Sequence, residues 1–352
     1  MAINSPASQF LQNISAIRKL LVQGQGFPDE FSKAEKWDSV KGESRHLAER
    51  IIGSYHRNPH LRSERNLRAG VNMMYCADEV LLCETDDDKM NVYRSFRCHG
   101  RFCPTCGWRK SIEKADKFGA NLPMILPENP KGRWMFATFT VPNMPVTELG
   151  VALTRMNQGW QRLIQTKAFK AGNAGWARCV EVTIEKARPM YANPHFHLLL
   201  FQKPSYFKGQ NYLKQTAWQD VRMRSLREPN NAIVNVRAIG GQKQKPDEDE
   251  LGGAIVELLK AMSYSLKGSS KHLTDEFLFH FMQQTRGRRM LASGGLLKNI
   301  FSDVEADELD GSEPLAVENH AFRFDGRYKY ERSSGLEERQ LERNRQIQAL
   351  RP

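Results

Sequence analysis

The sequence of 352 residues lacks any hydrophobic run long enough to cross a membrane. A membrane-spanning helix needs about 18 apolar residues, whereas the longest run here, Phe196–Phe201, is short and is broken by a histidine. The N-terminus has no basic region followed by an apolar one, and no internal repeat is visible. These absences argue against an integral membrane protein, a secreted protein and a repeat architecture.

Cysteine is also scarce, with six residues in the chain, at positions 76, 83, 98, 103, 106 and 179. Without an export signal, a framework of disulfides is not expected. Four of the six cysteines lie between Cys83 and Cys106, both included. This clustering favours a metal site over cross-links.

Positive charge, in contrast, is abundant. Lysine and arginine number 52 against 40 acidic residues, which gives a net charge of +12. This excess favours polyanionic partners, with nucleic acid as the default, although solubility alone is the alternative explanation. The hydrophobic fraction of 40% and the charged fraction of 26% are near the globular norm. The length suggests two domains, or one large domain with appendages.

The cysteine cluster has the spacing of a zinc site. In Cys98-x4-Cys103-x2-Cys106, the last two cysteines form a Cys-x2-Cys pair that can share one tetrahedral ion. The candidates for the fourth ligand are Cys76, Cys83 and His99. Reduced thiols without a ligand are the alternative. We predict a structural Zn²⁺ in basic surroundings that contact DNA phosphates. The basic residues concerned are Arg97, Arg101, Arg109 and Lys110.

Hydrophobic patterning predicts both strands and helices. Apolar runs or alternation indicate strands at 133–141, 177–185, 195–201 and 231–239. Helical spacing occurs at 145–170, 211–226 and 251–267. We interpret the proline-rich residues 120–130 as a linker. The residues after about 302 are acidic and then polar, and we interpret them as a flexible or loosely helical tail.

The stretch Pro194-His195-Phe196-His197 is the most informative in the chain. Residues i and i+2 of a strand share a face, so the two imidazoles point the same way and Phe196 points the other way. The preceding strand carries Glu181 and Glu185 on its polar face. If the two strands pair as a hairpin with matching apolar faces, one of these carboxylates lies beside the histidines.

Two histidines and one carboxylate with open positions suit a catalytic divalent ion. In a DNA enzyme that ion would be Mg²⁺ or Mn²⁺. The alternative is a histidine pair satisfied by ordinary hydrogen bonds. The residues alone leave the choice between Glu181 and Glu185 open.

A candidate nucleophile lies on the predicted helix at 251–267. Its apolar residues fill one arc, and the opposite arc holds Glu257, Lys260, Tyr264 and Lys267. The hydroxyl of Tyr264 can attack a metal-polarised phosphodiester, giving a 5′-phosphotyrosine and a free 3′-hydroxyl. Lys267, one turn away, would lower the tyrosine pKa from its usual value of about 10 or hold a phosphate. A surface tyrosine on an amphipathic helix is the alternative.

Together these residues resemble the rolling-circle replication initiators of small plasmids, in the single-tyrosine branch of the His-hydrophobic-His (HUH) endonuclease superfamily. The resemblance covers about 70–300, in the expected order. It rests on FATFTVPN (136–143), PHFHLLL (194–200) preceded by GWARCVEVT (175–183), SYSLKG (263–268), RCHGRFCPTCGWRKS (97–111) and RGRRMLASGGLLK (286–298).

The resemblance implies an α+β fold, with a central antiparallel sheet of the ferredoxin- or RRM-like palm type flanked by helices. It implies origin-specific nicking and joining through a covalent tyrosine intermediate, with a divalent metal. Among the open ligands it favours Glu181 for that metal and Cys76 for the zinc. The implied partners are double-stranded and single-stranded origin DNA, a host helicase and polymerase, and a second copy of the chain. The implied location is the prokaryotic cytoplasm, with no membrane.

The expected domains follow from these motifs. They are a helical N-terminal region (1–70), a cysteine-rich zinc module (71–115), an HUH endonuclease domain (125–302) and an acidic linker with a polar C-terminal tail (303–352).

One position departs from the resemblance. Some family members carry a glutamate one helical turn before the tyrosine, where this chain has Lys260. Glu257, two turns before Tyr264, is a candidate substitute as general base at termination. The rival functions are a single-tyrosine transposase, a relaxase, and a non-catalytic DNA-binding or copy-control protein. Relaxases usually have three histidines, transposases usually lack the cysteine cluster, and a non-catalytic protein would not need an intact Tyr264.

Overall fold

The computed structural model describes residues 32–84, 90–95, 97–125, 129, 131–185, 187–228, 232–239, 254–255, 257–259, 266–267, 273–302, 319–324 and 330–332. The chain divides into two compact units. The described residues of the histidine unit lie within Lys110–Val304, and those of the cysteine unit lie within Val22–Arg109 and Glu305–Pro352. Among the described helices, none is long and apolar enough to cross a membrane.

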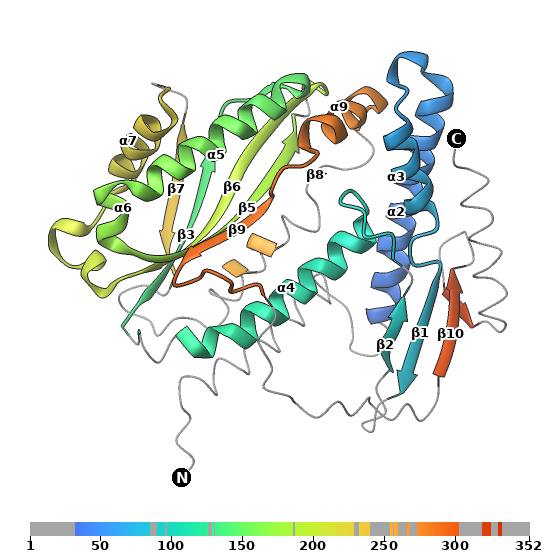
Figure 1. Cartoon of the computed structure of the whole chain (residues 1–352), viewed down its shortest axis with the longest axis horizontal. Helices are drawn as coiled ribbons and strands as arrows, with labels where there is room; N and C mark the ends of the chain where they lie inside the picture. Colours follow the sequence, from blue (N-terminus) through green and yellow to red (C-terminus); the bar gives the residue numbers. More distant parts are fainter. Residues whose placement is uncertain are drawn as a thin grey trace, which may run out of the picture. The chain divides into compact units, whose positions relative to one another are not determined.

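The histidine unit contains a mostly antiparallel sheet with the strand order β7-β3-β6-β5-β8 (Figure 1). Its strands are β3 (Arg133–Thr140), β5 (Asn173–Ile184), β6 (Tyr191–Gln202), β7 (Ile233–Ala238) and β8 (Leu266–Lys267). Two further strands join it, β4 (Met144–Pro145) on β6 and β9 (Leu291–Gly295) on β5. Only β8 pairs in parallel within the described sheet. The predicted α+β class with a central antiparallel sheet is confirmed.

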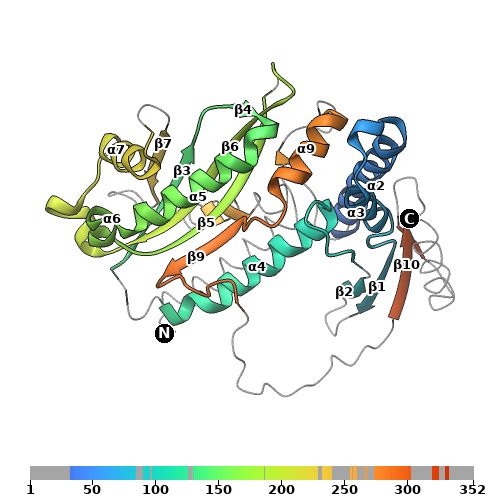
Figure 2. The same ribbon diagram turned by 45° about the horizontal axis from the view of Figure 1, so that its top comes forward.

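One face of this sheet is covered by helices. They are α5 (Leu149–Gln165), α6 (Lys167–Gly172) and α7 (Gln215–Leu226). Phe139 of β3 packs against Trp160 of α5 and Trp218 of α7, with ring centroids 6.3 and 6.1 Å apart. The apolar residues of α5 recur at helical spacing and are buried, so this helix lies along the strands in both views (Figures 1 and 2).

The opposite face carries the histidines and is covered over part of its length. From Lys110 onward, α4 (Pro104–Ile125) belongs to this unit, and its Phe118 packs on Trp134 and Phe301. Among its described residues the unit also contains α9 (Asp275–Thr285), the 3₁₀ turns η2 (Val146–Glu148), η3 (Pro204–Phe207) and η4 (Gly209–Asn211), and helical residues at 254–255 and 257–259.

The predicted linker at 120–130 is wrong for its first residues. Helix α4 continues through Pro123 to Ile125. The side-chain amide of Asn121 donates to the backbone carbonyls of Ile300 and Ser302, at 3.1 and 3.0 Å. These tertiary contacts hold the last turns of the helix, although the prolines alone suggested a break.

The cysteine unit combines helices with a small antiparallel sheet. The helices are α2 (Ser32–Arg57), the 3₁₀ turn η1 (Pro59–Leu61), α3 (Glu64–Met74) and the first turn of α4. The sheet has the order β11-β10-β1-β2, formed by β1 (Glu79–Glu84), β2 (Met90–Ser95), β10 (Asn319–Phe324) and β11 (Tyr330–Arg332). The Ser63 side chain caps α3 by accepting from the backbone N–H of Asn66 at 3.4 Å.

The prediction of a flexible or loosely helical tail is wrong for residues 319–324 and 330–332. β10 pairs antiparallel with β1, with Phe322 opposite Val80. Phe324 is buried in the same unit, and its ring lies 5.6 Å from the ammonium of Lys41. Strand β10 gave no local signal in the sequence, because its partner strand is far away in the chain and the residues around it are polar. The other domain boundaries stay predictions.

Candidate metal sites

The β5–β6 hairpin brings the predicted metal ligands together. In its register Glu181 lies opposite His195, and Cys179 lies opposite His197. The alternation of apolar and polar residue types along 177–185 and 194–198 favours this register, because a shift of one residue would turn the apolar residues to the wrong face. Pro194 has no backbone N–H to donate, and it falls where β6 passes from pairing with β3 to pairing with β4.

The three side chains meet at one carboxylate oxygen. Oε2 of Glu181 lies 2.5 Å from Nε2 of His195 and 2.6 Å from Nε2 of His197. The side chains of Glu181, His195 and His197 are 3%, 12% and 7% exposed. One ligand atom from each lies within 4.8 Å of the others, so the group can hold a metal ion. The donor set of two imidazoles and a carboxylate fits a divalent cation with positions left for substrate.

The carboxylate of this group is held in its charged form. Burial acts to raise the pKa of Glu181, but hydrogen bonds from His195 and His197 outweigh it, and the pKa lies well below its usual range. Glu181 is therefore an anionic ligand at neutral pH.

Glu185, the other acid considered, makes different contacts. Its carboxylate accepts from Nδ2 of Asn143 at 2.7 Å and pairs with Arg188 at 2.8 Å. The hydrogen bond from Arg188 lowers the pKa of Glu185. Glu185 lies two residues beyond Thr183, just after the end of β5, and is not part of the metal-capable group.

A stack of rings behind the histidines was not predicted. The Phe136 ring lies 5.7 Å from the His197 ring, at an interplanar angle of 30°. The guanidinium of Arg237 lies 5.3 Å from the centroid of the same Phe136 ring. Sequence reasoning gave strands at 133–141 and 231–239 without their facing partners, and the strand order β7-β3-β6 places the three side chains in a row.

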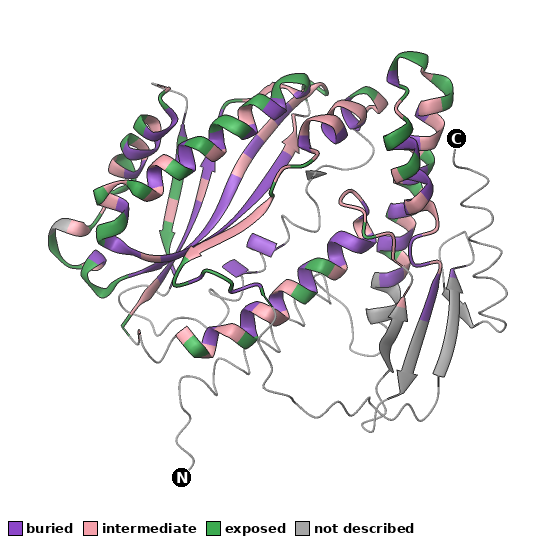
Figure 3. Cartoon of the chain, in the orientation of Figure 1, coloured by how far each residue is buried: buried purple, intermediate pink, exposed green. Residues whose placement is uncertain are grey.

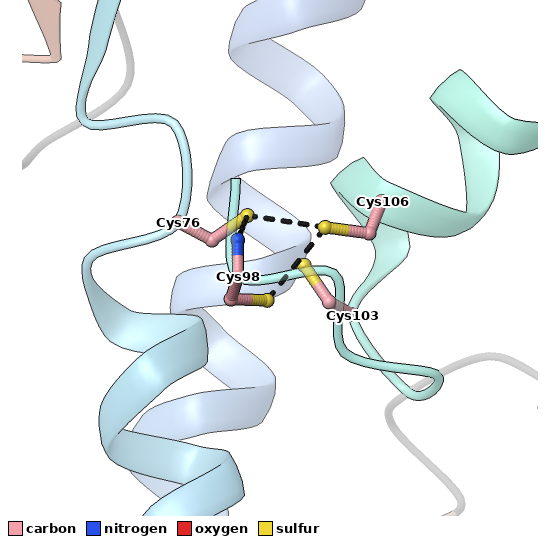
Figure 4. Close-up of side chains that lie close together, drawn as sticks. All are labelled: Cys76, Cys98, Cys103 and Cys106. Carbon is pink, nitrogen blue, oxygen red and sulfur yellow. Dashed lines mark hydrogen bonds between the residues drawn. The ribbon is translucent and has the colours of Figure 1, made fainter. Parts of the chain in front are cut away.

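The second group, in the cysteine unit, consists of Cys76, Cys98, Cys103 and Cys106 (Figure 4). Their sulfur atoms all lie within 4.8 Å of one another. Cys76 follows α3, Cys98 follows β2, and the other two bracket the start of α4. The sulfur of Cys106 lies 3.4 Å from that of Cys76 and 3.6 Å from that of Cys98. These distances fit four thiolates around one ion.

Backbone and hydroxyl groups surround these sulfurs. The N–H of Cys98 donates to the sulfur of Cys76, and the N–H of Gly100 donates to the sulfur of Cys98, both at 3.3 Å. The Ser44 hydroxyl lies 3.6 Å from the sulfur of Cys103. Hydrogen bonds from the neighbouring thiols, Cys106 first, lower the pKa of Cys103. Such donors orient metal ligands and stabilise thiolates.

The other two candidates for the fourth zinc ligand do not join this group. His99 is exposed and adopts a positive φ of 52°, which turns the chain between Cys98 and Gly100. The side chain of Cys83 lies outside the described residues, on β1. The structure thus brings together the four cysteines that the resemblance favoured, as reduced thiols rather than disulfides.

Lys41 holds the loop that carries Cys76. Its ammonium is fully buried, donates to the carbonyl of Met74 at 2.8 Å and pairs with Asp78. A lysine on a long helix gave no sign of this role in the sequence.

The predicted DNA-contacting residues lie in the segment 97–110. Arg109 lies over the rings of Trp37 and Trp108, with its guanidinium 5.5 and 5.8 Å from their centroids. Arg97 and Arg101 are half-buried, and Lys110 is exposed. Contact with DNA through these residues stays a prediction.

The predicted helix at 251–267 is corrected at its C-terminal end. Residues 254–255 and 257–259 are helical, and the apolar residues among them are buried as expected. Leu266 and Lys267, however, form β8, opposite Val182 and Thr183 of β5. Lys267 is therefore on a strand beside the metal-capable group and not on the polar arc with Glu257. Lys260 and Tyr264 lie outside the described residues.

Comparisons with known proteins agree with one another. The family model described as "Replication protein" (Rep_1) matches residues 89–333. A protein of Lactiplantibacillus plantarum named "Protein rep" is 29% identical over 246 residues, which cover 68% of this chain and 76% of that protein. One of the same name from Streptococcus pneumoniae serotype 2 is 28% identical, over 68% of this chain and 72% of that protein. A third, from Staphylococcus aureus, is 34% identical over 42% of this chain and 62% of that protein. No solved structure matches the chain.

Proposed function

We propose that this chain, which belongs to the replication protein family and serves as a plasmid replication initiator, nicks and rejoins origin DNA through Tyr264. The reaction would be a transesterification. The phenolic oxygen of Tyr264 bonds to the scissile phosphorus, the phosphorus–3′-oxygen bond breaks, and the phenolic proton is lost while the leaving oxygen gains one. The products are a 5′-phosphotyrosine and a free 3′-hydroxyl.

The observation that carries this proposal is the group formed by Glu181, His195 and His197 on one sheet face. These residues would hold a divalent cation, Mg²⁺ or Mn²⁺, whose charge would offset the negative charge that develops on the phosphate. These three residues would hold the cation in one position. The pairing of β5 with β6 holds both imidazoles, and the carboxylate of Glu181 stays ionised between them.

The position of β8 supports Tyr264 as the nucleophile. Leu266 follows Tyr264 by two residues and pairs with Val182, the neighbour of Glu181. Two residues of chain span at most about 7 Å, so covalent connectivity limits how far the tyrosine can be from this strand. Lys267 enters the sheet opposite Thr183, where its ammonium would hold a phosphate group.

The cysteine group would hold a structural Zn²⁺. Four thiolates leave no open position on a tetrahedral ion, so the ion would supply folding energy to the cysteine unit and not catalysis. We assign it to the proposed zinc module at 71–115, with Arg97, Arg101, Arg109 and Lys110 contacting DNA phosphates. The histidine unit would then be the HUH endonuclease domain with its palm-type sheet. Origin DNA, a host helicase and polymerase, and a second copy of the chain are the proposed partners.

The test is a covalent-adduct assay. Purified protein is incubated with Mn²⁺ or Mg²⁺ and a 5′- or 3′-labelled single-stranded oligonucleotide from the plasmid's origin, and the products are separated on a denaturing gel. Wild type should retain the label from the 3′ side of the cut, and Tyr264→Phe should form no adduct yet still bind the DNA. Tyr212→Phe, at an exposed tyrosine of the same unit, is the matched control. An adduct formed by Tyr264→Phe would assign the nucleophile elsewhere.

A further inference from the structure

Strand β7 forms one edge of the described sheet, on the side away from β8. Ile233, Asn235 and Arg237 pair with alternate residues of β3, and two of those β3 residues pair in turn with His195 and His197. Directly paired residues share a face of the sheet. The side chains of these three β7 residues, which we call the edge shelf, therefore continue the face that carries the metal-capable group.

The edge shelf is exposed, so its three side chains do not contribute to the buried core. Ile233 is 64% exposed, and Asn235 and Arg237 are exposed as well, whereas the intervening Val234 is buried under the helices. Figure 3 shows the contrast, with exposed residues along β7 and buried ones along the neighbouring strands. A single exposed apolar residue is ordinary on a protein surface. Ile233 is of interest because it shares a sheet face with Asn235, Arg237 and the metal-capable group.

The charge of this surface suits a polyanion. Strands β3, β6 and β7 contain no acidic residue. The guanidinium of Arg237 is held over the Phe136 ring, which itself contacts the ring of His197. Within the described part of the chain, no carboxylate pairs with Arg237, so its donors are available to a phosphate. Its tether to the ring limits the freedom it would lose on binding.

The edge shelf lies a short distance from the metal-capable group. β7 is two strands from β6, and strands lie about 4.8 Å apart, so the edge shelf begins roughly 10 Å from the histidines. In-line displacement puts the attacking and leaving oxygens on opposite sides of the phosphorus. The chain segment that follows Tyr264 enters the sheet on the β8 side. An attack from that side would direct the DNA that ends in the leaving 3′-oxygen toward β7.

We propose that the edge shelf binds the single strand on the 5′ side of the cleavage point, the strand that keeps the 3′-hydroxyl. Arg237 contacts a phosphate, Ile233 packs against a base or sugar, and Asn235 hydrogen-bonds between them. The proposal rests on the proposed nicking function. It adds a subsite that would keep the 3′-hydroxyl end near the metal after the cut.

The experiment uses full-length protein and nested origin oligonucleotides. The 3′ flank is constant, and the 5′ flank grows from one to eight nucleotides. For wild type, KM for adduct formation should fall as the first few nucleotides are added. Arg237→Ala should raise KM on the order of tenfold for the long 5′ flanks and leave KM for the shortest flank and kcat unchanged. Ile233→Ser should show the same pattern at about threefold.

Arg224→Ala is the matched control. It removes the same charge from an exposed arginine of α7, on the far face of the sheet, and should leave the flank dependence intact. The salt dependence gives a second readout, since loss of one contact to a single-strand phosphate lowers the slope of log affinity against log salt by about 0.7. Only Arg237→Ala should show this loss.

Two results would overturn the proposal. One is a loss in Arg237→Ala that follows the length of the 3′ flank or is the same for all flanks. The other is a change of oligomeric state in Ile233→Ser, measured by light scattering, which would make β7 an interface between copies. Fluorescence anisotropy of the same oligonucleotides without divalent metal measures the subsite without chemistry. Failure of cleavage with intact flank-dependent binding would count against the proposed function alone.

Discussion

Replacement of Arg222 by methionine is predicted to stabilise the histidine unit. Arg222 lies on α7 and is completely buried. Its Nε, Nη1 and Nη2 atoms have no hydrogen-bond partner in the described part of the chain. The guanidinium lies over the rings of Phe139 and Phe196, 5.2 and 5.6 Å from their centroids. The structure therefore holds a charged group in the core with aromatic faces as its principal support.

The size of the effect follows from this environment. Burial, with a smaller contribution from the charge of Arg178, lowers the pKa of Arg222 to about 9 from 12.5. At 1.36 kcal/mol per unit, the cost of keeping the ion charged in the folded state is roughly 5 kcal/mol. The depressed pKa means that the full penalty applies below pH 9 and is relieved only as pH rises toward 12.5. Contacts with two aromatic rings return about 1–2 kcal/mol each. Methionine keeps most of the side-chain volume, so Arg222→Met should gain about 1–3 kcal/mol.

Urea unfolding at pH 7, followed by tryptophan fluorescence, measures this gain. Trp160 and Trp218 are buried in the same core and report on it. Arg224→Met, at an exposed position of the same helix, is the matched control and should change the free energy of unfolding by less than about 0.5 kcal/mol. If Arg222→Met lowers stability by 1 kcal/mol or more, the guanidinium has a bound anion or water as partner, and the reasoning from an unpaired charge is wrong.

Three further predictions concern the proposed sites. His197→Ala should abolish adduct formation with either metal and reduce Mn²⁺ affinity at least tenfold by calorimetry, while Glu185→Gln, whose carboxylate contacts Asn143 and Arg188, should retain that affinity. Cys106→Ser should reduce bound zinc to below half an ion per chain by elemental analysis and destabilise the cysteine unit, whereas Cys179→Ser should keep the zinc. Glu257→Gln should leave initiation nicking near normal but impair termination, seen as multimeric single-stranded plasmid DNA; normal termination would assign the general base elsewhere.

The hairpin at the metal-capable group could be predicted because its signal is local. Strict alternation over 177–185 and the spacing of His195 and His197 fix which side chains share a face, and a short connection forces the strands to pair. The same logic reduced the acid to Glu181 or Glu185. Register alone then decides between them, and it puts Glu181 directly opposite His195.

The features that sequence reasoning missed depend on partners far away in the chain. Leu266 and Lys267 fit the apolar and polar arcs of the predicted helix, but in the structure they pair with β5 as a strand. β10 similarly gains its backbone hydrogen bonds from β1, more than 200 residues earlier. Helical periodicity reports which side of a segment is apolar, and it carries no information about an unpaired strand elsewhere. Tertiary hydrogen bonding therefore overrides local patterning at both places.

The two metal-capable groups differ in a way that separates structure from catalysis. Four sulfurs surround the centre of the cysteine group, and backbone N–H groups and the Ser44 hydroxyl lie around them, which leaves no position for a substrate oxygen. The histidine group offers three ligands, with His195 partly exposed and the edge shelf continuing its face. Three protein ligands with an open side are typical of a cation that acts on a substrate. If the proposed function is right, loss of an ion from the cysteine group should unfold the cysteine unit, whereas loss of an ion from the histidine group should leave a folded protein that binds DNA and does not cut it.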